Sequence, residues 1–320
     1  MDHVSGRATV AVVGGAGAVG STTAFALLDS DLVGEIILVD IDDERAAGQA
    51  ADLAHAAPFG FPTRVHTGSY EDCWDADVVI VTAGATQEPG ETRLELLERN
   101  AEIFAEVIPE ITDGMDDGVL LVVTNPVDVL SYLAWSVSDL PARRVIGSGT
   151  VLDTARFRHA LARRFDLAPE SVQAYVVGEH GDSAVPVWSA TTLGGVAFER
   201  YAAQAGIDDA VGLRSRIGDD IREAAYEIIE RKGRTNYGVA RAVASTVARI
   251  VGDDHAVVPV STLVSGHYGI DDEVYLSVPC LLDRSGVCDV VELDLSAAER
   301  AALADSAGVV ADSIDRLPVE

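Results

Sequence analysis

A glycine-rich segment near the N-terminus limits the folds open to this chain. The sequence GGAGAVGS (14–21) follows the apolar stretch ATVAVV (8–13) and precedes a stretch of helix-forming residues. Gly15, Gly17 and Gly20 have the G-x-G-x-x-G spacing, which permits a tight turn, close approach of the backbone to a pyrophosphate, and close packing of a helix on a strand. The phosphate then binds the free amides at the helix N-terminus. The segment therefore predicts a nucleotide-binding strand–turn–helix unit.

The first 150 residues continue this alternation of strand and helix. Short runs of Val, Ile and Leu are typical of strands buried on both faces of a parallel sheet. The expected strands are 8–13, 35–40, 77–83, 118–124 and 144–147, and the expected helices are 18–29, 43–56, 93–111 and 127–137. The pattern predicts an α/β fold with a doubly wound parallel sheet, the Rossmann arrangement, over residues 1–149.

Residues 150–320 have a different pattern, which predicts an α+β substrate domain. Its strands are expected to be antiparallel and to pack on the first domain. Since no Gly/Ser-rich linker occurs near residue 150, the two domains should share an interface. The expected helices are 151–165, 211–231, 236–250 and one from about 296, and the expected strands are 256–264, 274–283 and 287–294, with 171–182 forming a strand and then a loop.

An acidic residue specifies the nucleotide. Asp40 ends the second expected strand, twenty residues after Gly20, where its carboxylate can accept both ribose hydroxyls. A 2′-phosphate would meet Asp40, Asp42 and Asp43 before the first arginine, Arg45. The sequence therefore favours NAD over NADP.

The charge of the chain is unusually negative. Asp and Glu number 52 against 23 Lys and Arg, which gives a net charge of −29, and Lys232 is the only lysine. Nucleic acid is excluded as a partner because its phosphates would be repelled. The acidic residues are spread along the whole chain, and such self-repulsion is tolerable where salt shortens the Debye length to ~3 Å or less. We therefore expect a halophilic protein that works in a high-salt cytoplasm.

No feature of the sequence indicates a membrane or an export signal. No apolar run approaches the ~18 residues that a membrane span needs, and the N-terminus has no basic region followed by a cleavable apolar stretch. Cys73, Cys280 and Cys288 are widely spaced and odd in number. We expect small buried thiols in a reducing compartment, a cytoplasmic location, and no metal site.

Three residues are candidates for catalysis on the residues alone. His180 lies in GEHGDS between glycines, whereas most single histidines are satisfied surface or core residues. Arg93 follows a Pro-Gly hinge, and the alternative is an arginine that starts a helix and faces solvent. Arg156 could grip a carboxylate with both guanidinium nitrogens, or form an ordinary ion pair. Sequence spacing alone does not bring these groups together.

Four longer motifs carry a resemblance to a known family. TAGATQEPGETRLELLERN, TNPVDVL, VIGSGTVLDTARFR and GEHGDSAVPVWS together resemble the NAD-dependent L-lactate/malate dehydrogenases, most closely the bacterial-type L-lactate dehydrogenases. The similarity runs from about residue 8 to past residue 310, and the motifs occur in the family's order. It implies an NAD-dependent L-2-hydroxy acid oxidoreductase that transfers hydride between NADH and pyruvate.

The resemblance implies a role for each catalytic residue. His180 would be the general acid and base at the keto oxygen, and Asp153 would fix its tautomer and stabilise its protonated form. Arg156 would hold the substrate carboxylate, and Arg93 would move in with a loop and polarise the carbonyl. Asn125 would line the site beside a cis peptide bond to Pro126. Thr235 would flank the substrate side chain, and the cofactor would lie against Gly15, Gly17, Ala18, Val19, Gly20, Asp40, Thr82, Ala83, Gly84 and Asn125.

The loop 84–92 resembles the family's hinged lid, and Gln87 occupies its discriminating position. Malate dehydrogenases have an arginine there, which neutralises the second carboxylate of oxaloacetate. With Gln87, and with Glu88 beside it, that carboxylate would be enclosed without a counter-charge, at a cost of several kcal/mol. Pyruvate has only a methyl group there. The expected activity is therefore L-lactate dehydrogenase, with malate dehydrogenase or a broader 2-oxoacid reductase as the alternative.

The resemblance leaves three further expectations. Family members are dimers or tetramers, and a homotetramer is expected here. Gly14, Gly17 and Gly20 also have the G-x-x-G-x-x-G spacing of malate-type relatives, so the glycines do not identify the substrate.

Arg158 matches an arginine that binds fructose 1,6-bisphosphate in activated relatives, but Gln173 replaces the histidine, so little or no activation is expected. A catalytically silent NAD-binding protein is a remote alternative, since His180, Asp153, Arg156 and Arg93 are all present.

Overall fold

The computed structural model describes residues 6–85 and 92–317, and it confirms the mixed α/β class. Its largest element is a sheet of nine strands in the order β14-β13-β12-β6-β5-β4-β1-β2-β3. Six of these strands are parallel and follow the doubly wound order 3-2-1-4-5-6. They are β1 (Ala8–Val13), β2 (Val33–Val39), β3 (Arg64–Thr67), β4 (Val78–Val81), β5 (Val119–Val122) and β6 (Val145–Gly147).

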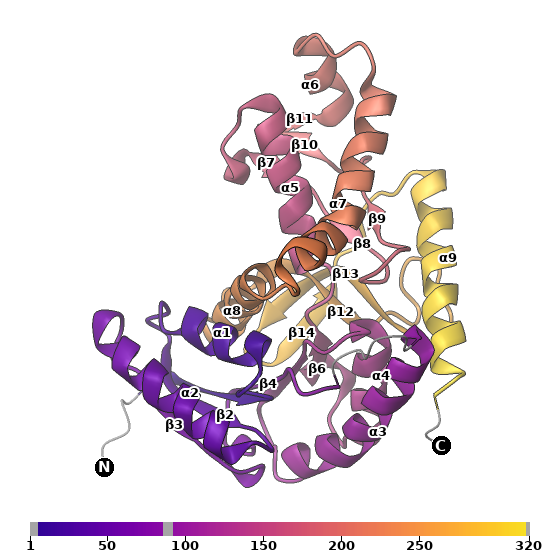
Figure 1. Cartoon of the computed structure of the whole chain (residues 1–320). Helices are drawn as coiled ribbons and strands as arrows, with labels where there is room; N and C mark the ends of the chain where they lie inside the picture. The colour runs from indigo at the N-terminus through magenta and orange to yellow at the C-terminus, as the bar shows by residue number, and fades with distance from the viewer. Residues whose placement is uncertain (1–5, 86–91, 318–320) are drawn as a thin grey trace.

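The parallel strands are buried as their composition predicts. Every residue of β4 and β5 is buried, and so are the last four of β1. Helices follow the strands, and α1 packs against α8 while α3 packs against α4 (Figure 1). These helices are α1 (Ala18–Leu27), α2 (Asp43–Ala56), α3 (Arg93–Thr112), α4 (Val127–Val137) and α8 (Tyr237–Val251).

The late antiparallel strands differ from the expectation. They were expected to pack on the first domain, but they extend its sheet, because Ser261 of β12 pairs with Gly147 of β6. The hydrogen-bonded ladder therefore continues from the parallel strands into the C-terminal half. The added strands are β12 (Ala256–Leu263), β13 (Tyr275–Asp283) and β14 (Gly286–Val290).

Most of the remaining elements form a projection above the sheet (Figure 1). Its core is a separate apolar cluster around Phe157, Leu161 and Phe198, which is closed by Leu213 and Ile217. The helices are α5 (Val151–Phe165), α6 (Phe198–Gln204) and α7 (Ala210–Lys232), and α9 (Ala297–Ile314) runs beside α4. Short strands accompany them: β7 (Val172–Gln173), β8 (Val176–Val177), β9 (Val185–Pro186), β10 (Thr192–Leu193) and β11 (Val196–Ala197).

Two expectations about exposure have different outcomes. None of the helices within residues 6–85 and 92–317 combines the length and the apolarity that a membrane crossing requires. The prediction of buried thiols is right for Cys73 and Cys280 but wrong for Cys288, which is exposed. Cys288 lies in β14, which is the edge strand of the sheet among the described residues.

Candidate active site

The glycine loop connects β1 to α1 in a conformation that needs glycine. Gly14 has a left-handed backbone with φ +84°, and a Cβ there would lie 2.5 Å from the amide nitrogen of Ala83. A Cβ on Gly20 would collide with the carbonyl oxygen of Gly14. Gly14, which the G-x-G-x-x-G spacing leaves out, thus provides the turn, and Gly20 permits α1 to pack closely against it.

The N-terminus of α1 suits a pyrophosphate. Gly17 is the N-cap residue, and no side chain caps the helix. The first turn contains no acidic residue, although acidic residues outnumber basic ones by more than two to one in the chain. The amides of Ala18 and Val19 belong to the four at a helix start that lack intrahelical acceptors. Uncapped amides and the positive end of the helix dipole together favour an anion there.

Asp40 links the second strand to the glycine loop. It follows β2 directly, and its Oδ2 accepts a hydrogen bond of 2.9 Å from the amide of Ala16. Its Oδ1 accepts a bond of 3.1 Å from the amide of Asp42. The half-buried carboxylate is thus fixed beside the loop, where lone pairs remain for ribose hydroxyls.

The residues that follow β4 form the rim of the candidate nucleotide site on the other side of the glycine loop from Asp40. The hydroxyl of Thr82 donates to the carbonyl oxygens of Val13 (3.0 Å) and Gly14 (3.2 Å), which joins this rim to the glycine loop. Ala83 and Gly84 follow, and the carbonyl oxygen of Ala83 accepts a bond of 2.7 Å from the Thr124 hydroxyl. All these groups lie at the carboxyl ends of parallel strands, where ligands bind in open α/β sheets.

A buried asparagine that the sequence analysis missed connects this rim to the next strand. Asn100 of α3 is 1% exposed. Its Oδ1 accepts from the amide of Ala85 at 2.7 Å, and its Nδ2 donates to the carbonyl oxygen of Asn125 at 3.0 Å. The exposed Asn125 is thereby held at the edge of the site, and its peptide bond to Pro126 is cis, as expected.

A histidine from the loop after β8 meets an aspartate and an arginine of α5. Asp153 and Arg156 are one helical turn apart, and Arg156 Nη1 donates to Asp153 Oδ1 at 2.9 Å. The other oxygen, Asp153 Oδ2, lies 2.6 Å from His180 Nδ1. The side chain of Asp153 is 8% exposed and that of His180 26%. The fold therefore brings together three of the four candidate catalytic residues, separated by up to 27 positions in sequence.

Burial and charge oppose each other in this cluster. Burial favours the neutral form of each group, but Coulombic attraction and the hydrogen bond to Asp153 raise the pKa of His180 above its usual 6.5. Likewise, His180 and then Arg156 outweigh burial and lower the pKa of Asp153. Asp153 is therefore an anion at neutral pH, and a protonated His180 is stabilised beside it.

A second buried carboxylate anchors the histidine loop, and the sequence analysis did not identify it. Asp128 of α4 is 2% exposed, and its Oδ2 accepts a bond of 2.7 Å from the amide of His180. Its Oδ1 accepts from the hydroxyls of Ser261 (2.6 Å) and Ser277 (3.3 Å). Burial raises the pKa of Asp128 to about 6, although the bonds from the Ser261 hydroxyl and the His180 amide oppose the shift. Its position in TNPVD, three residues after the predicted Asn125, was the available signal.

The chain matches two known protein domains, one after the other along the sequence. Residues 8–147 match the lactate/malate dehydrogenase NAD binding domain, and residues 150–318 match the lactate/malate dehydrogenase alpha/beta C-terminal domain. The chain belongs to the lactate/malate dehydrogenase family. Its nucleotide is accordingly NAD, as the glycine loop and Asp40 predict.

Relatives within this family are similar over nearly their whole length. An L-lactate dehydrogenase of Moorella thermoacetica is 48% identical over 314 residues, which cover 98% of this chain and 99% of that protein. One of Clostridium botulinum is 43% identical over 301 residues, or 94% of each. Among solved structures, a minor L-lactate dehydrogenase of Enterococcus mundtii has a TM-score of 0.94 at 38% identity, covering 98% of this chain and 99% of that one. A lactate dehydrogenase from a deep-sea metagenome library has a TM-score of 0.93 at 40% identity, covering 97% and 98%.

The structure describes the other expected site residues of this dehydrogenase only in part. Gln87 lies outside the described residues, as does most of the expected lid 84–92, and Arg93 is described only as the first residue of α3. Thr235 is half-buried in the connection between α7 and α8. Its neighbour Asn236 donates a bond of 3.0 Å to the hydroxyl of Thr22 in α1, so this connection lies against the nucleotide-binding helix.

Proposed function

We propose that this protein is an NAD-dependent L-lactate dehydrogenase that interconverts pyruvate and L-lactate. The observation that carries the proposal is the contact of His180 with Asp153, with Arg156 on the same carboxylate. An acid–base group beside an arginine suits a substrate with a keto group next to a carboxylate. The relatives named L-lactate dehydrogenase support the same reaction.

The nucleotide binds across the glycine loop, between Asp40 after β2 and the residues that follow β4. The residues proposed to hold it are Gly15, Gly17, Ala18, Val19, Gly20, Asp40, Thr82, Ala83, Gly84 and Asn125, and the Gly14 turn belongs with them. When bound there, the nicotinamide would supply the hydride for the carbonyl carbon of pyruvate and would take it up in the reverse direction.

The side chains of the chain supply the proton and the orientation. His180 donates the proton from Nε2 to the keto oxygen as the alcohol forms, because its Nδ1 faces Asp153. Asp153 stabilises the protonated imidazole and keeps its tautomer. Arg156 binds the substrate carboxylate with two parallel hydrogen bonds. Arg93 polarises the carbonyl once the lid excludes water, and Asn125 and Thr235 flank the substrate.

The choice of pyruvate over oxaloacetate rests on Gln87. A neutral amide leaves the second carboxylate of oxaloacetate without a counter-charge in a closed pocket, and burying an unpaired charge costs several kcal/mol. Malate dehydrogenase, or a broader 2-oxoacid reductase, is the second candidate, favoured only if a cation from elsewhere reaches that pocket.

Replacement of His180 tests the proposed chemistry. We expect H180Q to lower kcat for pyruvate reduction by ~10²–10⁴-fold, since a positioned acid contributes that much, while NADH still binds. The measurements are NADH oxidation by absorbance and NADH binding by fluorescence, with H55Q, at an exposed histidine of α2, as the control. Wild-type protein that binds NADH without turning over any 2-oxoacid would instead identify the silent NAD-binding protein.

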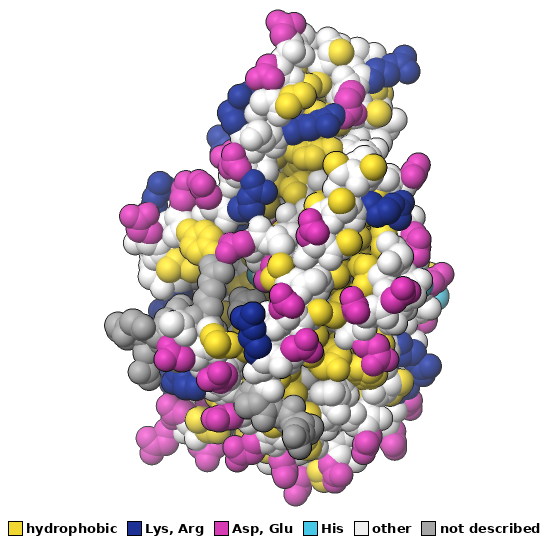
Figure 2. All heavy atoms as spheres, turned by 90° about the vertical axis from the view of Figure 1, so that its right-hand side faces the viewer, with side chains coloured by type: hydrophobic (Ala, Val, Ile, Leu, Met, Phe, Trp, Pro, Cys, Tyr) yellow, Lys and Arg dark blue, Asp and Glu magenta, His cyan; other side chains and the backbone are white. Residues whose placement is uncertain are grey.

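The proposal extends to assembly and environment. We expect a homotetramer in a high-salt cytoplasm, in a halophilic version of the family that serves glycolysis, with its domain boundary at residues 149/150. The support is the net charge of −29. Acidic side chains are scattered over the face shown in Figure 2 and do not gather in one block.

Activation by fructose 1,6-bisphosphate is not expected. The guanidinium of Arg158 donates to the carbonyl oxygen of Ala174 at 2.9 Å and lies 5.2 Å from the centre of the Tyr175 ring. Gln173 is exposed and uncharged, so it adds no positive charge for a second phosphate. The pyruvate saturation curve should stay unchanged when the effector is added, and a shift to lower pyruvate concentration would contradict this expectation.

A further inference from the structure

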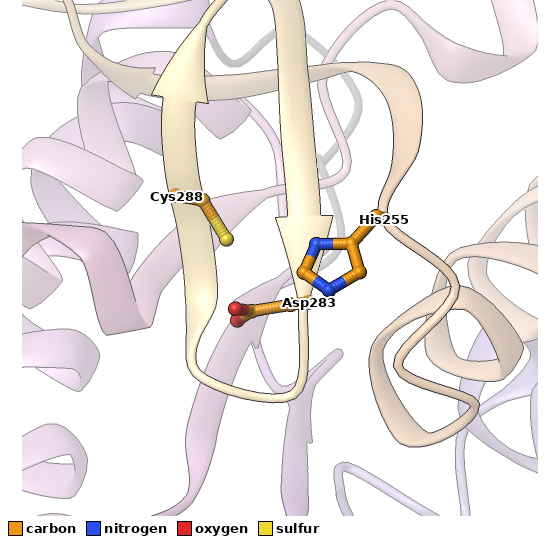
Figure 3. A group of neighbouring side chains, drawn as sticks. All are labelled: His255, Asp283 and Cys288. Carbon is orange, nitrogen blue, oxygen red and sulfur yellow. The ribbon is translucent and has the colours of Figure 1, made fainter.

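Three potential metal ligands meet at the outer end of the antiparallel strands. Figure 3 shows the ring of His255 and the thiol of Cys288 on either side of the Asp283 carboxylate. One ligand atom from each residue lies within 4.8 Å of the others. The thiol also donates a hydrogen bond to the Asp283 carboxylate.

The backbone directs all three side chains to this point. Asp283 is the last residue of β13, and the pairing of Ala256 with Leu282 places His255, the residue just before β12, beside it. Cys288 is the extra residue of a β-bulge, because Val287 pairs with Leu282 and Asp289 with Leu281. Bulges re-aim side chains, and this one leaves Cys288 outside the regular pairing.

His255 also departs from regular strand geometry. Its φ is +48°, in the left-handed region that few residues other than glycine adopt. The turn between α8 and β12 thus presents an imidazole to the hairpin formed by β13 and β14. On Asp283, Oδ1 accepts from the amide and the hydroxyl of Ser285, both at 2.6 Å, so the carboxylate is already oriented.

The donor set is chemically specific. Imidazole nitrogen, carboxylate oxygen and thiolate sulfur are the ligands that Zn²⁺ takes in proteins, and three protein ligands with one water complete a tetrahedral site. His255 and Cys288 are exposed and Asp283 is half-buried, so an ion can reach them from solvent. Asp253 also acts electrostatically on Cys288, which adds negative charge around the cluster.

We propose that His255, Asp283 and Cys288 form a binding site for a thiophilic divalent cation such as Zn²⁺, which joins the turn before β12 to the β13–β14 hairpin. The role is structural. Ser277, which contacts Asp128 in the active site, lies six residues back along β13, roughly 20 Å away at about 3.3 Å per residue. The ion therefore takes no part in proton transfer by His180.

Titration of the full-length, reduced and chelator-treated protein with Co²⁺ tests the site. We expect one equivalent to bind with a thiolate-to-cobalt charge-transfer absorption in the near ultraviolet, which Zn²⁺ abolishes by competition. C288S should lose the absorption, and H255A should bind Co²⁺ at least ~100-fold more weakly, since loss of even a group that only supports a metal ligand costs ~10–100-fold. H267A is the matched control, since His267 lies 3.4 Å from Glu292 without a thiol, and it should bind as the wild type does.

The remaining outcomes overturn the proposal. They are no charge-transfer absorption at millimolar Co²⁺, an absorption that persists in C288S, or weak binding that is equal in all variants, which would indicate exposed carboxylates only. Circular dichroism of metal-free C288S and H255A checks that both fold, and either variant is sufficient for the comparison. Zn²⁺ should also raise the Tm of the wild type but not of C288S, while kcat with pyruvate stays the same.

Discussion

At the scale of single residues, the ionisation of His180 is decided by a competition between burial and a neighbouring charge. Burial alone would lower the pKa of His180, but the Asp153 carboxylate at 2.6 Å raises it above 6.5. With His180 as the proposed acid and base, pyruvate reduction requires the protonated imidazole and lactate oxidation requires the neutral one. The raised pKa therefore extends the reductive direction to higher pH than an isolated histidine would permit.

Removal of the Asp153 charge should reverse this effect. In D153N the pKa of His180 falls, because burial is then unopposed by the carboxylate, so the limb of kcat/KM for pyruvate that declines with rising pH moves to lower pH. We also expect kcat to fall by ~10²–10⁴-fold, since the proton donor loses its orientation. D166N is the control, at an exposed aspartate that ends the same helix. A pH profile of D153N that coincides with the wild type would refute the assigned role.

At the scale of elements, the site depends on the carboxyl ends of the parallel strands. Gly14 follows β1, Asp40 follows β2 and Thr82 follows β4, so three separate strands bring the groups proposed to bind the nucleotide to one edge of the sheet. Asp128 then ties α4 to the His180 loop and to two antiparallel strands. The side chains of the site are thus positioned by long-range hydrogen bonds as well as by the helices.

Two glycine substitutions separate close packing from helix propensity. G20A places a Cβ against the carbonyl oxygen of Gly14 and 2.8 Å from Thr82 Oγ1, so it should weaken NADH binding at least ~10-fold and cost about 1–3 kcal/mol of stability. G48A, in the exposed interior of α2 with no atom within 4 Å, should stabilise the fold by about 0.5–1 kcal/mol. NADH fluorescence titration and urea unfolding measure both effects. Unchanged NADH affinity in G20A would contradict the assigned loop.

The sequence predicts the buried strands and the helices well but predicts tertiary pairing poorly. The Val-rich runs of β1, β4 and β5 are recognisable because both faces are buried, whereas β3, with the sequence RVHT, is short, polar and was not predicted. Continuation of the sheet from β6 to β12 depends on the pairing of Ser261 with Gly147, two residues that are far apart in the sequence. The same limit applies to Asn100 and Asp128, whose roles exist only after folding.

At the scale of the whole molecule, the dominant property is charge. A net charge of −29 on 320 residues opposes the compact state and any assembly of identical subunits. Added salt shortens the Debye length from ~30 Å at 0.01 M to ~3 Å at 1 M and so removes most of that repulsion. The substrate and the cofactor are themselves anions, so screening should favour their binding as well.

Activity and assembly should therefore rise together with KCl. We expect NADH oxidation and a tetramer at 2 M KCl, and dissociation with loss of activity near 10 mM, because carboxylates at subunit contacts then repel unscreened. Sedimentation velocity and enzyme assays over one KCl series provide the test. Sucrose at matched osmolality is the control for effects other than ionic screening. Full assembly and activity in salt-free buffer would refute the halophilic assignment.

We propose that this family member prefers pyruvate because Gln87 leaves the second carboxylate of oxaloacetate unpaired. The most direct measurement compares kcat/KM for pyruvate and for oxaloacetate at molar KCl, in the wild type and in Q87R. We predict a wild-type preference for pyruvate of ~100-fold or more, equivalent to about 2.7 kcal/mol, and a shift towards oxaloacetate in Q87R. A wild-type preference for oxaloacetate would contradict the account and would make the protein a malate dehydrogenase.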